Sequence, residues 1–341
     1  MQDLTDPAIW LPLTFASLMG LSILIYVILD GFDLGVGVLF PFAEAHEKDN
    51  MIASIGPFWD ANETWLVLAV GILLVAFPQA HGTILTALYL PVFVMLIGLI
   101  LRGVAFEFRV KAPLPQKGMW DAAFWIGSLM TSLSQGFMLG IYIMGLDQSW
   151  LSLGFATVCA VFLTVGYSFI GATWLILKTE AELQRKAVAW AKGGIWGILL
   201  GIGAVSIVSP LVSPRIFDKW FSWPEIVLLA PMPVVMAGLI WITWLSLRYL
   251  PQKDDSFAWF PFVATIAMFV AAFFGLAYSF YPYVVPDQLT IYEAASAPES
   301  LMIILVGTVI VMPMIAGYTV LAYTVFRGKA TELRYDMQGP N

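Results

Sequence analysis

Acidic side chains in two closely spaced pairs are the residues of this sequence with the clearest capacity for chemistry. Asp30 and Asp33 stand three residues apart in DGFDLGVGVLF, and Asp60 and Glu63 have the same spacing in GPFWDANETW. Residues three apart lie on one face of a helix. Because a carboxylate in the hydrocarbon core of a bilayer costs at least ~2.5 kcal/mol, acids within apolar runs are candidates for proton transfer.

A basic residue accompanies them in LILRGVAFEFRVK, which contains Arg102 and, five residues later, Glu107. An arginine keeps its charge in any protein environment. If Arg102 points inward it needs a carboxylate, which Asp60 or Asp33 could supply; if it points outward, its guanidinium can reach the lipid headgroups. We favour the inward arrangement, in which acids and hydroxyls leading inward from one membrane face form a proton path.

Structural explanations compete with these functional ones. Acids in the first turn of a helix are stabilised by the helix dipole, and Pro57 is typical of a first-turn residue. Both explanations stay open for Asp60, whereas helix stabilisation is the simpler explanation for Glu63. Trp59 and Trp65, which flank the acids, are expected mainly at the lipid boundary, with a cofactor contact as the alternative.

Metal and haem ligands are scarce in this sequence. The two histidines, His46 and His81, fall in predicted loops, whereas a haem buried between helices takes axial His, Met or Cys ligands from those helices. Methionine is more often a packing residue than a ligand. The single cysteine, Cys159, excludes an internal disulfide or a cysteine-ligated cluster. We therefore expect this chain itself to ligate no haem, zinc or copper.

The elements that hold these residues must be membrane helices. Of 341 residues, 60% are hydrophobic and 11% are charged, against about 25% charged residues in an average soluble domain, and the mean hydropathy is +0.86. This composition excludes a soluble globular protein, a disordered chain and a nucleic-acid binder. Apolar runs of ~20 residues or more predict an all-α, polytopic membrane protein.

Apolar runs broken by charges predict nine transmembrane helices in a single integral membrane domain, 1–341. We place them near 9–40, 57–77, 84–106, 121–144, 152–177, 195–213, 225–247, 258–280 and 301–326. The first four (about 9–144) carry the acidic motifs, the other five (about 152–326) form a second group, and 327–341 is a tail. The N-terminus lacks the basic start of a secretory signal, so the first run is expected to remain as a helix. Glycines four apart, at 31/35 and 136/140, predict close helix contacts.

The basic residues predict the orientation of the chain. Two of the 16 Lys and Arg, Arg215 and Lys219, lie in the segments opposite to those that hold most bases, and Arg102 lies within the third run. The other thirteen lie in the alternate segments 41–56, 107–120, 178–194, 248–257 and 327–341. Because cytoplasmic loops carry such an excess, we expect a periplasmic N-terminus and a cytoplasmic C-terminus. The acidic pairs then gather in the cytoplasmic third of the membrane.

The intramembrane acids and the pattern of spans are also compatible with two functions other than a proton path for a partner protein. A proton-coupled secondary transporter is favoured by the intramembrane acids and by prolines at 91, 210, 231, 233 and 313, which could break helices around a central site. Against it, the acids cluster toward one membrane face and the sequence shows no convincing inverted repeat. The other alternative is a purely structural anchor in which every acid is paired for packing.

Five ordered motifs resemble subunit II of cytochrome bd-type quinol oxidases, with the closest likeness to the cyanide-insensitive branch. They are DGFDLGVGVLFPF (30–42), SIGPFWDANETWLV (54–67), LRGVAFEFR (101–109), MWDAAFWIGS (119–128) and YPYVVPDQLTIYEAAS (281–296). The resemblance runs along the whole chain, and the first 130 residues are its most specific part.

This resemblance implies a respiratory terminal oxidase of the bacterial inner membrane that oxidises quinol, reduces O₂ to water with cytoplasmic protons and builds a proton gradient without pumping. It implies two four-helix bundles plus one peripheral helix. Two b haems and a d haem, or a b-type replacement, would belong to the partner, subunit I, which this chain would stabilise. A quinone bound to this chain, small accessory subunits and lipid are further partners to consider. Some family members have a histidine where this chain has Phe58.

The resemblance also assigns residues. Matched by motif, the acid of the family's PxWD sequence is Asp60, the acids of its DGFD sequence are Asp30 and Asp33, its intramembrane arginine is Arg102, and the acid five residues later is Glu107. We expect Asp60 to act as a relay carboxylate near the subunit interface. Arg102 would set the local electrostatic potential so that Asp60 or Glu107 exchanges protons. A neighbouring cation lowers the pKa of a carboxyl group and burial raises it, so the two effects can be balanced.

Overall fold

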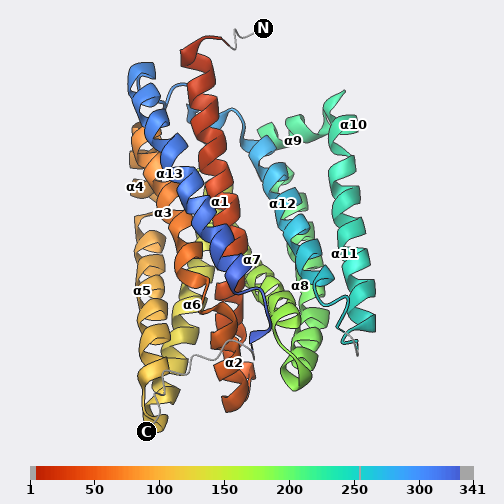
Figure 1. Cartoon of the computed structure of the whole chain (residues 1–341). Coiled ribbons are helices and arrows are strands. Elements are labelled where there is room, and N and C mark those ends of the chain that lie inside the picture. The colour runs from red at the N-terminus through yellow and green to blue at the C-terminus, as the bar shows by residue number, and fades with distance from the viewer. Residues whose placement is uncertain (1–4, 253–254, 331–341) are drawn as a thin grey trace.

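The computed structural model describes residues 5–252 and 255–330, and most of these residues form long helices that run side by side (Figure 1). Nine helices within them are long and apolar enough to cross a membrane, which confirms the all-α, polytopic prediction. The spanning helices are α1 (Pro7–Leu39), α3 (Trp59–Ala76), α5 (Tyr89–Lys111), α6 (Leu114–Ile143), α7 (Trp150–Lys178), α8 (Ala181–Val212), α10 and α11 together (Glu225–Leu229 and Pro231–Tyr249), α12 (Phe260–Phe280) and α13 (Pro298–Val325). Shorter elements connect them: η1 (Phe40–Phe42), α2 (Ala45–Ile55), α4 (Pro78–Ala87), α9 (Pro214–Phe221), β1 (Tyr283–Val285) and β2 (Leu289–Thr290).

Several helix boundaries differ from those predicted. The segments 107–120 and 178–194, predicted as loops, are largely helical because α5, α6 and α8 extend into them. Charged side chains are compatible with a helix that has left the hydrocarbon, so charge alone does not mark where a helix ends. The predicted span 84–106 is wrong at its start. The backbone leaves helical geometry at Leu88 (φ −107°, ψ 15°), where α4 ends and α5 begins.

Single residues in the connecting segments also differ from prediction. His46 lies in α2 and His81 in α4, so both histidines are helical, although outside the spanning helices. Pro57 lies in the turn before α3 and not in its first turn. Pro210 and Pro313 lie inside α8 and α13, which continue through them. These two prolines therefore do not divide their helices in the way that the transporter alternative requires.

The first helix is the longest element and extends along the whole molecule (Figure 1). Its N-terminus is capped by Asp6, whose carboxylate accepts a hydrogen bond from the backbone N–H of Ala8 at 2.9 Å. At 1.5 Å per residue its 33 residues span about 50 Å, whereas the hydrocarbon core of a bilayer is ~30 Å thick. A helix of this length must tilt in the membrane or extend beyond the hydrocarbon.

Glycines permit very close helix crossings in the interior. A Cβ added at Gly35 of α1 would lie 1.7 Å from the carbonyl oxygen of Tyr167 on α7, and one added at Gly171 would lie 2.6 Å from the Gly35 backbone. A Cβ at Gly136 of α6 would lie 2.6 Å from Cα of Ala160 on α7. Side chains are sterically excluded at these positions, in agreement with the predicted close packing of small residues.

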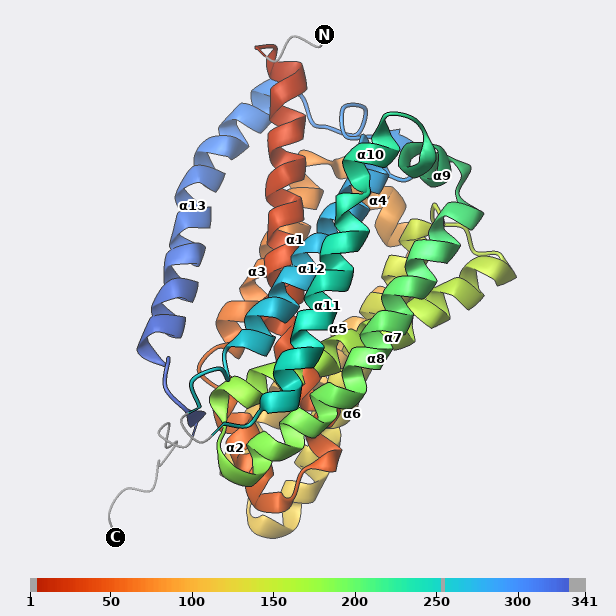
Figure 2. The ribbon, with the colours of Figure 1, turned by 90° about the vertical axis from the view of Figure 1, so that its right-hand side faces the viewer.

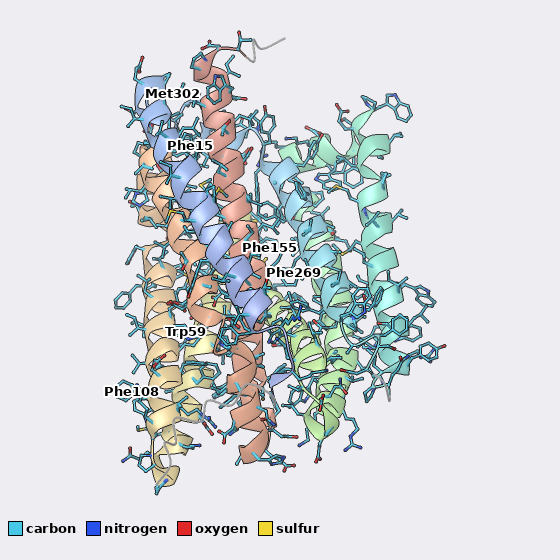
Figure 3. All side chains as sticks on the ribbon, in the orientation of Figure 1. Phe15, Trp59, Phe108, Phe155, Phe269 and Met302 are labelled. Atoms are coloured by element: carbon cyan, nitrogen blue, oxygen red, sulfur yellow. The ribbon has the colours of Figure 1, made fainter. Side chains whose placement is uncertain are left out.

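The last helix is peripheral. α13 packs along α3 and α1 and stands at the edge of the molecule, on the side away from α8 (Figure 2). Its buried residues are few: Leu301, Thr319 and Ala322. Met302 on α13 and Phe108 on α5 lie on the outer surface among many other apolar side chains (Figure 3). The peripheral position of α13 matches the fold that the resemblance implies, while the division of the other eight spans into two bundles stays a prediction.

Among the described residues, one small sheet departs from the all-α prediction. β1 and β2 form an antiparallel pair in the connection between α12 and α13. The hydroxyl of Tyr142, near the end of α6, donates to the carbonyl of Val284 at 2.6 Å and so ties the pair to the helices. This connection covers the end of the molecule that also holds the N-terminus of α1 (Figure 2).

At the opposite end, α2 is held to the bundle by a buried carboxylate. The Glu47 side chain is 2% exposed and accepts hydrogen bonds from Lys186 Nζ at 2.9 Å and from the backbone N–H of Glu44 at 2.7 Å. Burial raises the pKa of Glu47, but these two hydrogen bonds outweigh it, so that this pKa lies below its ordinary value of 4.5. A lowered pKa means that the contact stabilises the fold above about pH 4.5 and is lost as the pH falls further.

We predict that Glu47→Gln loosens α2 at neutral pH, because the amide cannot form the ion pair with Lys186. Hydrogen exchange of residues 45–55, corrected for the intrinsic rate at each pH, measures this. The native protein should lose protection only below about pH 4.5, and the variant should show low protection throughout. Equal protection of the two proteins at neutral pH would show that Glu47 does not hold α2.

Candidate functional site

Arg102 lies at the centre of a buried ion cluster. Its side chain, on α5, is 3% exposed. Its Nη2 atom donates to Asp30 Oδ1 on α1 at 2.6 Å and to Glu63 Oε1 on α3 at 2.5 Å. The guanidinium thus joins three spanning helices, and it has the carboxylate partners that a cation inside the hydrocarbon requires.

The second acid of the first pair has a different partner. Asp33 is 1% exposed, and its Oδ2 accepts a hydrogen bond from the Asn62 side chain at 2.8 Å. Asn62 also donates to the Leu29 carbonyl at 3.3 Å, and its Oδ1 accepts from the hydroxyl of Tyr323 at 3.0 Å. Since Tyr323 belongs to α13, the asparagine connects the buried carboxylate to the peripheral helix.

A further set of polar side chains lies one helical turn from Asp30. Gln135 on α6 donates to the hydroxyl of Tyr26 on α1 at 2.7 Å and accepts from the hydroxyl of Tyr167 on α7 at 2.6 Å. Gln135 belongs to the polar part of α6, and its contacts join α1, α6 and α7. Hydroxyl and amide groups therefore continue inward from the acids on α1.

Close packing of α5 against α6 places Arg102 in this arrangement. A Cβ at Gly127 of α6 would lie 2.7 Å from the backbone nitrogen of Arg102, and one at Gly98 of α5 would lie 2.6 Å from Oγ1 of Thr131. With the α5 backbone held against α6 at this point, the long Arg102 side chain extends to α1 and α3. The i, i+3 spacing of the acids on α1 places both of them in the interior.

The cluster contains more carboxylates than cations. Asp30, Asp33 and Glu63 gather near the single guanidinium of Arg102. One polar atom on each of Asp30, Asp33, Arg102 and Thr131 is buried without a hydrogen-bond partner among the described residues. Buried charge that is not compensated is costly, and a proton shared within the cluster would reduce that charge. The three carboxylates are the groups of this cluster that could bind such a proton.

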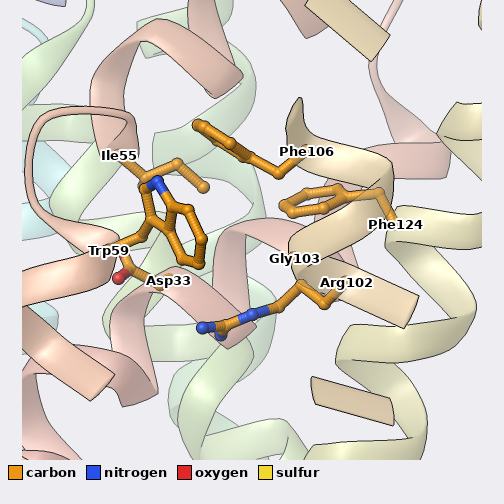
Figure 4. A pocket seen from close by; sticks show the side chains of 7 residues that line it. All are labelled: Asp33, Ile55, Trp59, Arg102, Gly103, Phe106 and Phe124. Atoms are coloured by element: carbon orange, nitrogen blue, oxygen red, sulfur yellow. The ribbon is translucent and has the colours of Figure 1, made fainter. Parts of the chain in front are cut away.

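Trp59 covers a small cavity beside the cluster (Figure 4). The cavity has a volume of about 10 Å³ and is lined by Asp33, Ile55, Trp59, Arg102, Gly103, Phe106 and Phe124. The Trp59 ring lies 5.4 Å from the Phe106 ring, centre to centre. A cavity of this size holds about one water molecule. Trp65, the other tryptophan beside the acids, donates to Thr319 on α13 at 3.1 Å.

Three of the four predicted acids meet at the cluster, but Asp60 does not. Asp60 and Glu63 are three residues apart on α3, and Glu63 turns inward to Arg102 while Asp60 is exposed on the isolated chain. The predicted partners of Arg102, Asp60 or Asp33, are therefore corrected to Asp30 and Glu63. The structural explanation preferred for Glu63 is likewise wrong, since this acid is part of the ion cluster and the one in the first turn is Asp60.

Glu107 also lies apart from the cluster. Its side chain is 56% exposed and its ionic contact is with Lys111, one turn later on α5, at 4.0 Å. The expected influence of Arg102 on Glu107 has no direct contact to support it. Phe58, at the position where some family members have a histidine, is fully buried and stacks on Tyr323 with ring centres 4.5 Å apart.

A second ionic network near the ends of α5 and α6 was missed by sequence reasoning. Arg109 is 4% exposed and donates to Asp121 at 2.5 Å and to Asp49 at 2.7 Å, and Lys48 donates to Asp121 at 3.1 Å. The network links α2, α5 and α6 outside the apolar part of the spans. Its signal was present in the motif MWDAAFWIGS, whose acid is Asp121. Asp121 is the first residue of the predicted span 121–144 and Arg109 lies in the segment before it, and no pairing between them is predicted from the sequence.

The chain offers few residues for a metal or haem. Within residues 5–252 and 255–330, no group of three His, Cys, Asp or Glu side chains is placed to hold a metal ion. His46 and His81 lie on α2 and α4, outside the spanning helices, and Cys159 is buried in α7 as a free thiol.

The nine apolar helices found in residues 5–252 and 255–330, three of which share a buried arginine–carboxylate cluster, define a polytopic membrane protein with ionisable groups in its interior. The profile of the family described as cytochrome bd terminal oxidase subunit II matches residues 11–326, and the chain belongs to this family. The resemblance of its motifs is thus confirmed. Membership makes the chain one subunit of an oxidoreductase complex of the bacterial membrane, in which it pairs with subunit I and which contains haem.

Relatives match over almost the whole chain. The cytochrome bd ubiquinol oxidase subunit 2 of Bacillus subtilis is 27% identical over 330 residues, which cover 90% of this chain and 93% of the relative. The cytochrome bd-I ubiquinol oxidase subunit 2 of Escherichia coli K12 is 25% identical over 359 residues, with 92% and 94% coverage. A chain of the bd oxidase structure from Geobacillus thermodenitrificans has the same fold, with a TM-score of 0.75, 18% identity and coverage of 94% and 100%.

We predict that Arg102→Gln prevents stable accumulation of the complex. The substitution leaves the buried Asp30 carboxylate without its cation, and breaking a buried ion pair costs roughly 3–5 kcal/mol. The measurement is the amount of this chain and of haem absorbance that co-purifies with a tagged partner subunit. Adding Asp30→Asn to Arg102→Gln should restore part of the yield. If the double variant is no better than the single one, the pairing does not determine stability.

We also predict that Tyr323→Phe loosens α13 without unfolding it. The variant loses the hydrogen bond to Asn62, worth about 1 kcal/mol, and keeps the ring contact with Phe58. Hydrogen exchange of the C-terminal half of α13 should therefore increase. Tyr318→Phe on the same helix is the matched control, because Tyr318 is 50% exposed. Equal exchange in both variants would mean that the Asn62 bond does not hold the helix.

Proposed function

We propose that this chain is subunit II of a respiratory quinol oxidase that reduces O₂ to water with electrons from quinol and protons from the cytoplasm, and that builds a proton gradient without pumping. In this proposal the chain has two tasks: it stabilises the haem-bearing subunit I, and it supplies part of the proton path. Family membership and the names of the relatives support the assignment to a quinol oxidase, since both the Bacillus and the Escherichia proteins are named as ubiquinol oxidase subunits.

We assign the haems, two of b type and one of d type or a b-type replacement, to subunit I. The support is the donor set of this chain, whose histidines lie outside the spanning helices. A haem bound by the partner supplies the site of oxygen reduction. This chain would orient the partner and exclude water from the shared face through the apolar side chains on the outside of α3, α5 and α13.

The observation that carries the proton path is the graded exposure of three acids. Asp60 is exposed on the isolated chain, the Glu63 side chain is 29% exposed, and Asp30 is fully buried. Glu63 and Asp30 bind the same Arg102 nitrogen, and Asp60 lies one helical turn from Glu63, so the three acids lead from the surface of the helix bundle to its interior. An exposed acid in the first turn of a spanning helix is where a partner subunit could accept a proton.

In this arrangement Asp60 exchanges protons with subunit I, and the cluster around Arg102 stores them. Glu63 connects the two, because it contacts Arg102 and lies one helical turn from Asp60. Asp33 and its contact with Asn62 extend the store toward α13. Glu107, near the end of α5, would act as an entry group.

The orientation with a periplasmic N-terminus and a cytoplasmic C-terminus belongs to the same proposal. It is supported by the excess of Lys and Arg in the alternate segments of the sequence. The cluster then lies toward the cytoplasmic side, where the protons are taken up. Family membership does not favour the transporter alternative. The structural-anchor alternative differs from the relay in the expected effect of neutralising Asp60 on turnover.

We predict that Asp60→Asn slows oxygen consumption by roughly tenfold or more while haem content stays unchanged, because a positioned proton-transfer group typically contributes ~10²-fold or more. Steady-state oxygen uptake with quinol and the haem spectrum of the purified complex measure both effects. Asp147→Asn is the control, since Asp147 is an exposed acid in the α6–α7 connection.

Two results would contradict the relay. Loss of haem together with subunit I in Asp60→Asn would assign this residue to assembly. Full turnover in Asp60→Asn and also in Glu63→Gln, with the complex intact, would favour the structural anchor.

A further inference from the structure

A second cavity lies at the end of the molecule opposite the N-terminus of α1, and the proton path does not use it. It has a volume of about 300 Å³ and is lined by Leu177, Asp255, Ala258, Trp259, Arg327, Gly328 and Lys329. Leu177 is next to the end of α7, Trp259 precedes α12, and Arg327 follows α13 by two residues. The ends of three spanning helices therefore surround the cavity, which places it where hydrocarbon gives way to headgroups.

The charged side chains of this cavity differ in whether they already have partners and can therefore bind a ligand. Lys329 pairs with Asp255 and donates to the Thr179 carbonyl at 3.1 Å. Lys178, the last residue of α7 and the neighbour of Leu177, donates to the carbonyls of Phe326 and Gly328 at 2.6 and 2.8 Å. These contacts fix the backbone around the cavity. Arg327 is exposed, and no ion pair of its guanidinium is found among the described residues, so it is the available cation.

The other residues in and beside the cavity are aromatic and apolar, which suits an amphipathic ligand. Trp259 is 46% exposed at the rim, and an indole ring at this depth is typical of contact with the headgroup region. Leu321 and Val325 on the last turns of α13 are 60% and 61% exposed, and Val263 on the first turn of α12 is 48% exposed. An apolar surface for acyl chains thus leads away from the cavity along both helices.

We propose that this cavity binds the headgroup of an anionic phospholipid, with the phosphate at Arg327 and the acyl chains along α12 and α13. Arg327 supplies the charge, Trp259 contacts the glycerol region, and Asp255 disfavours a second negative group on the side of Lys329. The bound lipid would lie between the peripheral helix α13 and the start of α12. The inference does not depend on the proton path.

The test is native mass spectrometry of the purified oxidase complex after addition of phosphatidylglycerol or phosphatidylcholine with the same acyl chains. The native complex should retain phosphatidylglycerol in preference to phosphatidylcholine. Arg327→Gln should reduce this retention about fivefold, which corresponds to about 1 kcal/mol for one basic residue near an anionic lipid surface. Lys111→Gln is the matched control, because Lys111 is a 77% exposed cation at the end of α5 whose one ionic contact among the described residues is with Glu107.

A variant with the opposite expected sign makes the test independent of any loss of folding. Asp255→Asn removes the carboxylate from the cavity and releases Lys329, so that retention of phosphatidylglycerol should increase. Equal retention of the two lipids, or equal loss in Arg327→Gln and Lys111→Gln, would overturn the proposal. Displacement of phosphatidylglycerol by inorganic phosphate would also overturn it, since the cavity would then be a site for soluble anions.

Discussion

The interior of this membrane protein is organised around one guanidinium in a medium that opposes charge. Arg102 binds Asp30 and Glu63 through a single nitrogen, and these contacts join α5 to α1 and α3. Because a cation without partners in hydrocarbon would be costly, the positions of the three helices are coupled to one another. The glycines that bring α5 to α6 and α1 to α7 serve the same arrangement, since they set the distances over which the side chains meet.

The cluster is also the part of the structure where stability and chemistry depend on the same atoms. Its acids outnumber its cations, and several of its polar atoms are buried without a partner among the described residues. A purely structural ion pair would be better served by equal charges and complete hydrogen bonding. The proposed proton store rests on this excess of acid. The proposed proton exchange with subunit I rests on Asp60, which is exposed on α3.

Much of this could be predicted from the sequence, and the failures have a common cause. The number of spans, the buried acids on α1 and the need of Arg102 for a carboxylate followed from hydropathy and from the cost of charge in lipid. The identity of its partners did not follow, because it depends on the rotation of α3 about its axis. That rotation puts Glu63 inside and Asp60 outside, and it is set by contacts of α3 with α1 and α13 that no spacing rule contains. The pairing of Arg109 with Asp121 was missed because both residues were assigned to a loop or helix start.

The few contacts of α13 have a consequence for the way in which the fold can open locally. This helix is apolar along its length, and only a small part of it is buried against the rest of the protein. It is thus stable in lipid by itself, and docking is a separate and weaker step. The ion pairs of Arg102 with Asp30 and Glu63 lie on α1, α3 and α5, so separation of α13 from the other helices would leave them in place. Such a separation would break the hydrogen bonds from Tyr323 to Asn62 and from Trp65 to Thr319, and it would open the molecule on one side only.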